Sequence, residues 1–194
     1  MMNNTVFTNK KFELNGISIP EFKLVSGQII KIYIPNFDSD NNELGHKFSL
    51  LLSDEFQNQN SELIWTKEHS GTGLWKLLKP ISVGGFIMND LKIDLKKAQN
   101  ISEYLELDVN GKVNDLLLGK RKALAIKCNF EKFDSLIFDY YGIGAAEIDY
   151  VEKIVDSEIR KGKSAIIFDR LEFQRKKELY ENIEPLKIKV PNII

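Results

Sequence analysis

The chain has 194 residues, of which 27 are lysine or arginine and 28 are aspartate or glutamate, so its formal net charge is −1. This length allows one well-formed core with a small second lobe, and the balanced charge excludes the basic surface typical of nucleic-acid-binding proteins. The only cysteine, Cys128, excludes an internal disulfide framework. The sequence shows neither a signal peptide nor an apolar run of about 20 residues. We therefore expect a cytoplasmic protein that has no direct membrane span and reaches a membrane only through a partner subunit.

The first third of the chain predicts short strands and then a helix. Alternating or apolar runs bounded by glycine and proline predict strands at residues 12–19, 21–25 and 29–34. A polar loop follows at residues 36–42. Apolar residues then recur at helical spacing, and the buried face of this helix would comprise Leu44, Phe48, Leu51 and Leu52. Residues 62–65 predict a further strand.

The middle of the chain predicts mostly helix. Residues 71–85 are interrupted by glycines and Pro80 and predict no regular element. Residues 86–97 and 101–107 predict two helices, and residues 113–130 predict a turn followed by a helix.

A strand–helix–strand unit at residues 134–170 forms the centre of the prediction. Residues 135–138 and 164–168 are short apolar runs, typical of parallel strands that are covered on both faces. Between them, apolar residues at helical spacing predict a helix that ends near Gly162. The first strand ends in Asp139, and ligands bind at the carboxyl ends of strands in open α/β sheets. Residues 171–183 predict an amphipathic helix, and residues 185–190 predict a closing strand.

Three segments together resemble the ATP-binding domain of ABC transporters. Residues 26–36, Ser-Gly-Gln-Ile-Ile-Lys-Ile-Tyr-Ile-Pro-Asn, are similar to the strand that leads into that family's phosphate loop. Residues 115–125, Asp-Leu-Leu-Leu-Gly-Lys-Arg-Lys-Ala-Leu-Ala, resemble its signature motif, and residues 134–170 resemble its Walker B strand, the following helix and its switch strand. The resemblance implies one ABC ATPase-like domain over residues 1–194. Its fold would be α/β, a P-loop NTPase-like three-layer core with a mixed or parallel sheet and a small helical lobe at about residues 86–125.

The phosphate loop of that family is not intact in this chain. An ungapped comparison places Asp40 at the family's lysine and Asn41 at its Mg²⁺-binding hydroxyl, and no glycine falls at the loop's glycine positions. Side chains and negative charge would then lie where phosphates bind. A gapped comparison restores a lysine at Lys47, but Phe48 then replaces the hydroxyl.

The catalytic positions around the predicted central strand are altered as well. Tyr140 stands at the family's catalytic glutamate, and tyrosine is a poor base at neutral pH because its pKa is near 10. Tyr141 stands at the proline that follows, and the switch histidine becomes Arg170 or Asp169. Only Asp139 is kept. It is either a Mg²⁺ ligand or a carboxylate that caps a loop, and without a phosphate loop we favour the cap.

The signature motif has lost its serine and first glycine, which become Leu117 and Leu118, whereas Gly119 is kept. The lysines and arginine after Gly119 are either an anion site at a helix start or a solvated basic face. His46, His69 and Cys128 have no partners at metal-ligand spacing, so we predict no metal site.

The resemblance and its losses imply a degenerate ABC-type subunit without catalytic residues or a required cofactor. It would act as a structural or regulatory partner of an active ATPase, a membrane subunit or both, in a homo- or heterodimer. Its altered face would be a protein interface, which comprises Phe37, Leu117, Leu118, Tyr140 and Tyr141. Two alternatives stay open: a weak ATPase that binds ATP and Mg²⁺ through Lys47, Asp139 and Gly119, and an α/β interaction scaffold without nucleotide.

Overall fold

The structure is a computed structural model, and it describes residues 4–38, 40–68, 80–174 and 182–189. The chain divides into two compact units. The sheet unit comprises Met1–Trp65, Phe133–Gly142 and Asp156–Ile194, and the helical unit comprises Thr66–Lys132 and Ile143–Val155. None of the helices within the described ranges combines the length and apolar character needed to cross a membrane.

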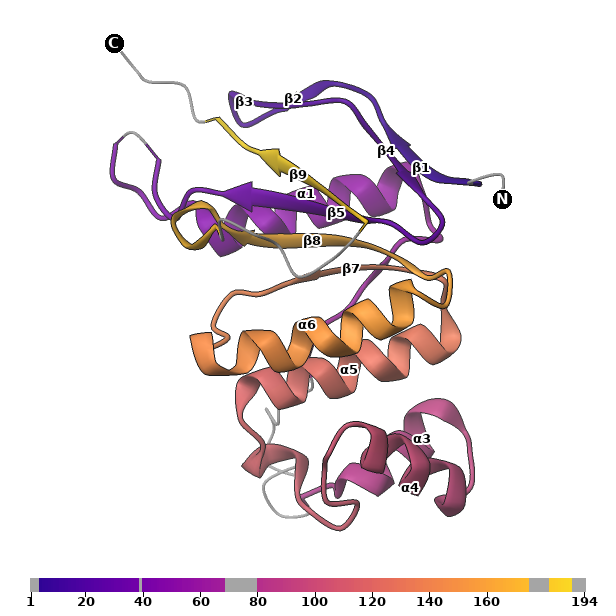
Figure 1. The fold of residues 1–194 in the computed structure, drawn as a ribbon. Coiled ribbons are helices and arrows are strands. Elements are labelled where there is room, and N and C mark those ends of the chain that lie inside the picture. The colour runs from indigo at the N-terminus through magenta and orange to yellow at the C-terminus, as the bar shows by residue number, and fades with distance from the viewer. Residues whose placement is uncertain (1–3, 39, 69–79, 175–181, 190–194) are drawn as a thin grey trace. The chain divides into compact units, whose positions relative to one another are not determined.

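A five-stranded sheet forms the centre of the sheet unit (Figure 1). Every neighbouring pair in it is parallel. The strand order is β6 (Ile64–Trp65), β7 (Ser135–Asp139), β8 (Ser164–Arg170), β5 (Ile29–Ile34) and β9 (Ile183–Lys187). Each residue of β5 and β7 is buried, as expected of parallel strands with near-continuous apolar sequence. The predicted α/β core with a largely parallel sheet is confirmed.

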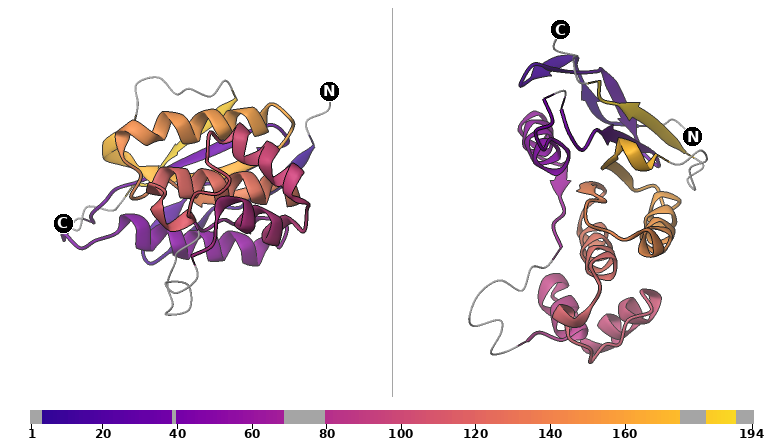
Figure 2. Two further views of the ribbon diagram at one scale, coloured as in Figure 1. Left: turned by 90° about the horizontal axis from the view of Figure 1, so that it is seen from below. Right: turned by 90° about the vertical axis from the view of Figure 1, so that its left-hand side faces the viewer.

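One core of the sheet unit lies between the sheet, one helix and two antiparallel strand pairs. The helix is α1 (Gly45–Gln59), seen along its axis in the right view of Figure 2. The strand pairs are β1 (Thr5–Asn9) with β4 (Phe22–Val25), and β2 (Phe12–Leu14) with β3 (Ile17–Ile19). Phe56 joins them, since its ring centroid lies 5.6 Å from that of Phe7, 5.5 Å from that of Phe22 and 6.3 Å from that of Phe168. This packing fixes α1, whose first residue follows the loop after β5.

Side-chain caps mark the starts of two helices in the helical unit. It contains α3 (Val83–Leu91), α4 (Leu95–Tyr104), the short 3-10 helix η1 (Val113–Asp115), α5 (Leu118–Lys132) and most of α6 (Ala145–Ile159). Ser82 Oγ accepts a hydrogen bond from Gly85 N at 3.0 Å, and Asp94 Oδ1 accepts one from Lys97 N at 2.9 Å. Lys92 has φ of 56°, which ends α3 and splits the helix predicted at residues 86–97 into two.

The helix predicted at residues 171–183 is wrong over its described parts. Leu171–Phe173 forms only one 3-10 turn, η2, after which Gln174 takes an extended ψ of 124°. Ile183 already belongs to β9, which pairs with β5. Residues 175–181 lie outside the described residues. Pairing with the central strand overrides the helical periodicity at Ile183, since tertiary contacts outweigh weak propensities.

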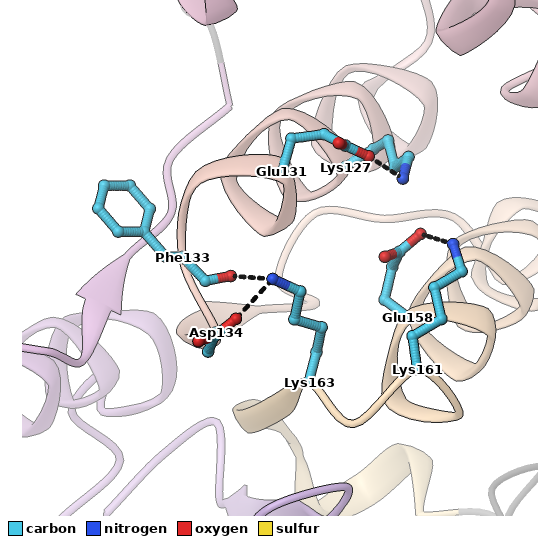
Figure 3. Close-up of polar contacts among 7 residues, drawn as sticks. All are labelled: Lys127, Glu131, Phe133, Asp134, Glu158, Lys161 and Lys163. Carbon is cyan, nitrogen blue, oxygen red and sulfur yellow. Dashed lines mark hydrogen bonds and ion pairs between the residues drawn. The ribbon is translucent and has the colours of Figure 1, made fainter.

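Lysine side chains make contacts at the amino ends of the parallel strands β7 and β8 (Figure 3). Lys163, just before β8, places its Nζ 3.0 Å from the carbonyl oxygen of Phe133 and 2.7 Å from Oδ1 of Asp134, just before β7. Lys161 and Glu158 form a second pair at 2.8 Å. In the helical unit, Lys127 pairs with Glu131 one turn along α5. The starts of β7 and β8 are therefore tied together at the edge opposite their carboxyl ends.

Candidate functional site

Asp139 lies at the carboxyl end of β7 and is buried. Its Oδ1 accepts a hydrogen bond from the backbone N–H of Tyr141 at 2.9 Å. Its Oδ2 lies 3.6 Å from Nδ1 of His46, the second residue of α1. A carboxylate that caps the turn after a strand makes such a bond to the backbone. The imidazole of the half-exposed His46 lies next to it.

Two backbone N–H groups at the start of α1, those of the N-cap residue Leu44 and of Gly45, are bonded to the preceding loop. Leu44 N donates to the carbonyl oxygen of Asn36 at 2.8 Å, and Gly45 N donates to the carbonyl oxygen of Pro35 at 3.1 Å. In a phosphate-binding loop, N–H groups at this place point toward the anion. Here the end of β5 supplies the acceptors, so these two donors are already bonded within the chain.

The loop between β5 and α1 closes on Asp38. Asp38 Oδ1 accepts hydrogen bonds from Asp40 N at 2.9 Å and Asn42 N at 2.8 Å, and its Oδ2 accepts one from Asn42 Nδ2 at 3.0 Å. Phe37 and Glu43 form an isolated antiparallel bridge across the loop. The hydrogen bonds from Asn42 lower the pKa of Asp38, so the loop carries a fixed negative charge at neutral pH.

The residues that a gapped phosphate loop would use point to other partners. Lys47 Nζ lies 2.8 Å from a carboxylate oxygen of Glu43, and both side chains are exposed. Phe48, which follows at the Mg²⁺-ligand position, lies on the buried face of α1 and is part of the core. Phe37 is 55% exposed, so its ring extends into solvent rather than filling a cavity.

Tyr140 is fully buried in the sheet unit. Its ring centroid lies 6.0 Å from that of Phe138 and 5.3 Å from Nζ of Lys31. Lys31 is itself buried in β5, and its Nζ lies 3.2 Å from Oδ2 of Asp169 in β8. Tyr140, at the general-base position of the resembled family, is thus a core residue above an internal ion pair and is not exposed for an interface.

Sequence reasoning missed the pair of Lys31 and Asp169. The signal was present, because a lysine in the middle of the run Ile-Ile-Lys-Ile-Tyr-Ile would be buried if that run were a central strand. A buried ammonium needs a counter-charge, and Asp169 at the end of β8 supplies it. The neighbouring Arg170 Nε lies 4.0 Å from the other oxygen of the same carboxylate.

Tyr141 lies against the start of α1. A Cβ added to Gly45 would lie 3.0 Å from Cε1 of Tyr141, so a side chain there would require the Tyr141 ring to shift. The Tyr141 ring also lies 5.5 Å from the imidazole of His46, measured between centroids. Burial raises the pKa of Tyr141, and the nearby Asp169 and Asp139 add to the shift, so its phenol stays neutral.

In the helical unit, Gly119 lies in the first turn of α5 and is buried against Glu147 of α6. A Cβ added to Gly119 would lie 2.7 Å from Cβ and 2.8 Å from Oε1 of Glu147. A carboxylate near a helix N-terminus is electrostatically favourable. The place where one of the two sequence interpretations would put an anion is thus next to a carboxylate of the chain itself. Leu117, just before the helix, is 64% exposed, and Leu118 is half-buried.

The described residues offer no group of three or more histidine, cysteine, aspartate or glutamate side chains that could hold a metal ion. His69 lies outside the described residues. Cys128 is buried, and burial raises the pKa of its thiol to about 12, which keeps it protonated. Asp139 and His46 are therefore two convergent polar groups rather than a complete ligand set.

The comparisons with known proteins place the fold. No protein-family model matches the sequence, and no curated protein matches it. Solved structures do match: an ABC transporter ATP-binding protein from Pyrococcus furiosus has a TM-score of 0.63 at 12% identity, covering 92% of this chain and 93% of its own. MJ1267, an ATP-binding cassette of an ABC transporter in its ADP conformation, has a TM-score of 0.58 at 13% identity over 97% of this chain and 90% of its own.

A third neighbour is larger than this chain. It is an RNase-L Inhibitor, with a TM-score of 0.55 at 13% identity, and the match covers 87% of this chain but only 35% of the inhibitor. Such low identities bear on the fold alone. The chain therefore has the fold of the ATP-binding cassettes of ABC transporters.

Proposed function

We propose that this chain is a degenerate ABC-type ATP-binding subunit. It does not hydrolyse ATP, and it acts as a structural or regulatory partner of an active ATPase, a membrane subunit or both. One observation carries the proposal: the N–H groups of Leu44 and Gly45, at the start of α1, donate to the carbonyl oxygens of Asn36 and Pro35.

Phosphate would have to displace these bonds to reach the helix start. Each net backbone hydrogen bond contributes about 0.5–1.5 kcal/mol, and the incoming anion would also approach the ionised carboxylate of Asp38. The lysine that might offset this charge, Lys47, is already paired with Glu43. Phe48 lies in the core and offers no oxygen to Mg²⁺. The residues around the start of α1 therefore do not fit Mg·ATP.

The side chains that ATP hydrolysis would need at the catalytic positions are missing as well. Tyr140 is buried and packs over Lys31, so it cannot orient a water molecule beside a phosphate. In the helical unit, Glu147 lies against Gly119, so the start of α5 presents a carboxylate where a partner's nucleotide would need a donor. Each unit by itself thus disfavours nucleotide chemistry.

A partner role is supported by apolar residues that remain exposed. Phe37 in the sheet unit and Leu117 in the helical unit are each more than half exposed, and we propose each as an anchor of a protein contact on its own unit. Of the half-buried residues, Tyr141 would add to the contact of the sheet unit and Leu118 to that of the helical unit, whereas Tyr140 belongs to the core.

The catalytic part of the proposal is tested by phosphate release from the purified protein with Mg·ATP. We expect no release above that of the Asp139→Asn variant. Steady release that Asp139→Asn abolishes would refute inactivity and favour the weak ATPase.

The partner part is tested by purification from native extract. Leu117→Ser should lose a co-purifying subunit while its melting temperature stays unchanged. Leu95→Ser is the matched control, since Leu95 is 51% exposed in the same unit but outside the proposed interface. Equal recovery with both variants would contradict the role of Leu117.

A further inference from the structure

A cavity in the sheet unit, whose lining includes no residue of the candidate site, is independent of the proposed function. It has a volume of about 450 Å³ and is lined by three segments: the residue before β2, the end of the β2–β3 hairpin with the residues that follow it, and the end of β9. Its lining residues are Lys11, Ser18, Pro20, Glu21, Lys187 and Lys189. A cavity of this volume suits a small ligand.

The charges around this cavity are unbalanced. Three lysines, Lys11, Lys187 and Lys189, line it together with a single acidic residue, Glu21. Within the described part of the chain, no ion pair or hydrogen bond engages the ammonium group of any of the three. By contrast, Lys163 at the amino edge of the sheet is paired with Asp134 at 2.7 Å.

The backbone that carries these lysines is anchored. Ile17 and Ile19 in β3 are buried, and Ile188, between Lys187 and Lys189, is buried in the same core. Its N–H donates to the carbonyl oxygen of Tyr33 at 2.9 Å. The backbone on both sides of Ile188 is therefore held by core packing, so Lys187 and Lys189 extend from fixed positions beside the cavity.

We propose that this lysine pocket, defined by Lys11, Ser18, Lys187 and Lys189, binds a small anion that carries two or more adjacent phosphate groups. Three lysines around one cavity raise the local positive potential, and this potential favours the binding of an anion. Lysine binds phosphate as a point charge, and the exposed hydroxyl of Ser18 adds a hydrogen-bond donor. Several phosphate groups on one ligand carry more charge than a single carboxylate or phosphate, and they can span ammonium groups that lie apart.

The test is calorimetric titration with inorganic tripolyphosphate, orthophosphate and an oligoglutamate peptide. We expect tripolyphosphate to bind best, and the double variant Lys187→Gln/Lys189→Gln to weaken its binding at least about tenfold. Lys23→Gln is the control, because Lys23 is an exposed lysine of β4 that does not line the pocket. Thermal unfolding of each variant verifies that its fold is kept.

The other outcomes overturn the proposal. They are no tripolyphosphate binding by the wild-type protein, equal loss in the double variant and Lys23→Gln, orthophosphate binding as tight as that of tripolyphosphate, or tighter binding of oligoglutamate. The last result would make the pocket a docking surface for an acidic protein segment.

Discussion

Replacing Lys31 by methionine tests the ion pair beneath the candidate site. The Lys31 and Asp169 side chains are 1% and 4% exposed and their charged atoms lie 3.2 Å apart. Removing one partner of such a pair leaves an uncompensated buried charge, which costs about 3–5 kcal/mol. The substitution also removes the ammonium that lies 5.3 Å from each of the ring centroids of Tyr33 and Tyr140. Because Arg170 Nε lies 4.0 Å from the remaining carboxylate, we expect the lower end, about 3 kcal/mol.

The assay is urea unfolding at pH 7 followed by circular dichroism. Lys31→Met/Asp169→Leu removes both charges and should recover most of the loss, since apolar replacements of a buried pair are often neutral. Lys163→Met is the control: Lys163 pairs with an Asp134 side chain that is 90% exposed, so we expect a loss within about 1 kcal/mol. A double variant no more stable than Lys31→Met would refute the reasoning, as would a loss for Lys31→Met no larger than that of the control.

Three further predictions follow from burial and close contact. Tyr140→Ala should lower the free energy of unfolding by about 3–5 kcal/mol, as for other buried aromatic residues. Phe37→Ala, at an exposed position, should change it by less than about 0.5 kcal/mol. Similar urea midpoints for the two variants would contradict this division between core and surface. Gly119→Ala should cost about 1–3 kcal/mol because a Cβ there meets the neighbouring glutamate at 2.7 Å, and Gly144→Ala, with open space around it, is the matched control. Burial raises the pKa of Tyr150 to about 12, so the stability that its neutral phenol contributes is present below its unfolded pKa of about 10 and is lost as the pH rises through 12. Wild-type stability should therefore fall more steeply than that of Tyr150→Phe between these pH values, and parallel melting curves would contradict the role of Tyr150.

The sheet was predictable because fully buried parallel strands are encoded as continuous apolar runs. The predicted strand at residues 29–34 coincides with β5, and those at residues 135–138 and 164–168 fall within β7 and β8. The helical periodicity of the sequence did not predict where one helix ends and the next begins, because a single residue decides that boundary. Lys92 takes a left-handed conformation that a lysine rarely adopts, and it divides α3 from α4 without any glycine or proline to mark the break.

The candidate site was predictable in position but not in its contacts. Asp139 was expected at a strand end because the strand pattern stops there, and the missing glycines of the phosphate loop are visible in the sequence. The burial of Tyr140 follows from its place directly after β7, a strand in which every residue is buried. The contact of Glu147 with Gly119 joins two helices, and the pairing of Lys31 with Asp169 joins two strands. Such non-local contacts carry no periodic signal.

Titration with Mg·ATP tests the central claim most directly. That claim is that the N–H groups and the charges around the loop between β5 and α1 do not fit a triphosphate. The titration uses the Lys187→Gln/Lys189→Gln variant, in which the lysine pocket has lost two of its three cations. We predict no saturable heat and no rise in melting temperature at millimolar Mg·ATP, since a ligand that binds only the native state must stabilise it. Saturable binding that is lost in Lys47→Ala or Asp139→Ala would contradict the account.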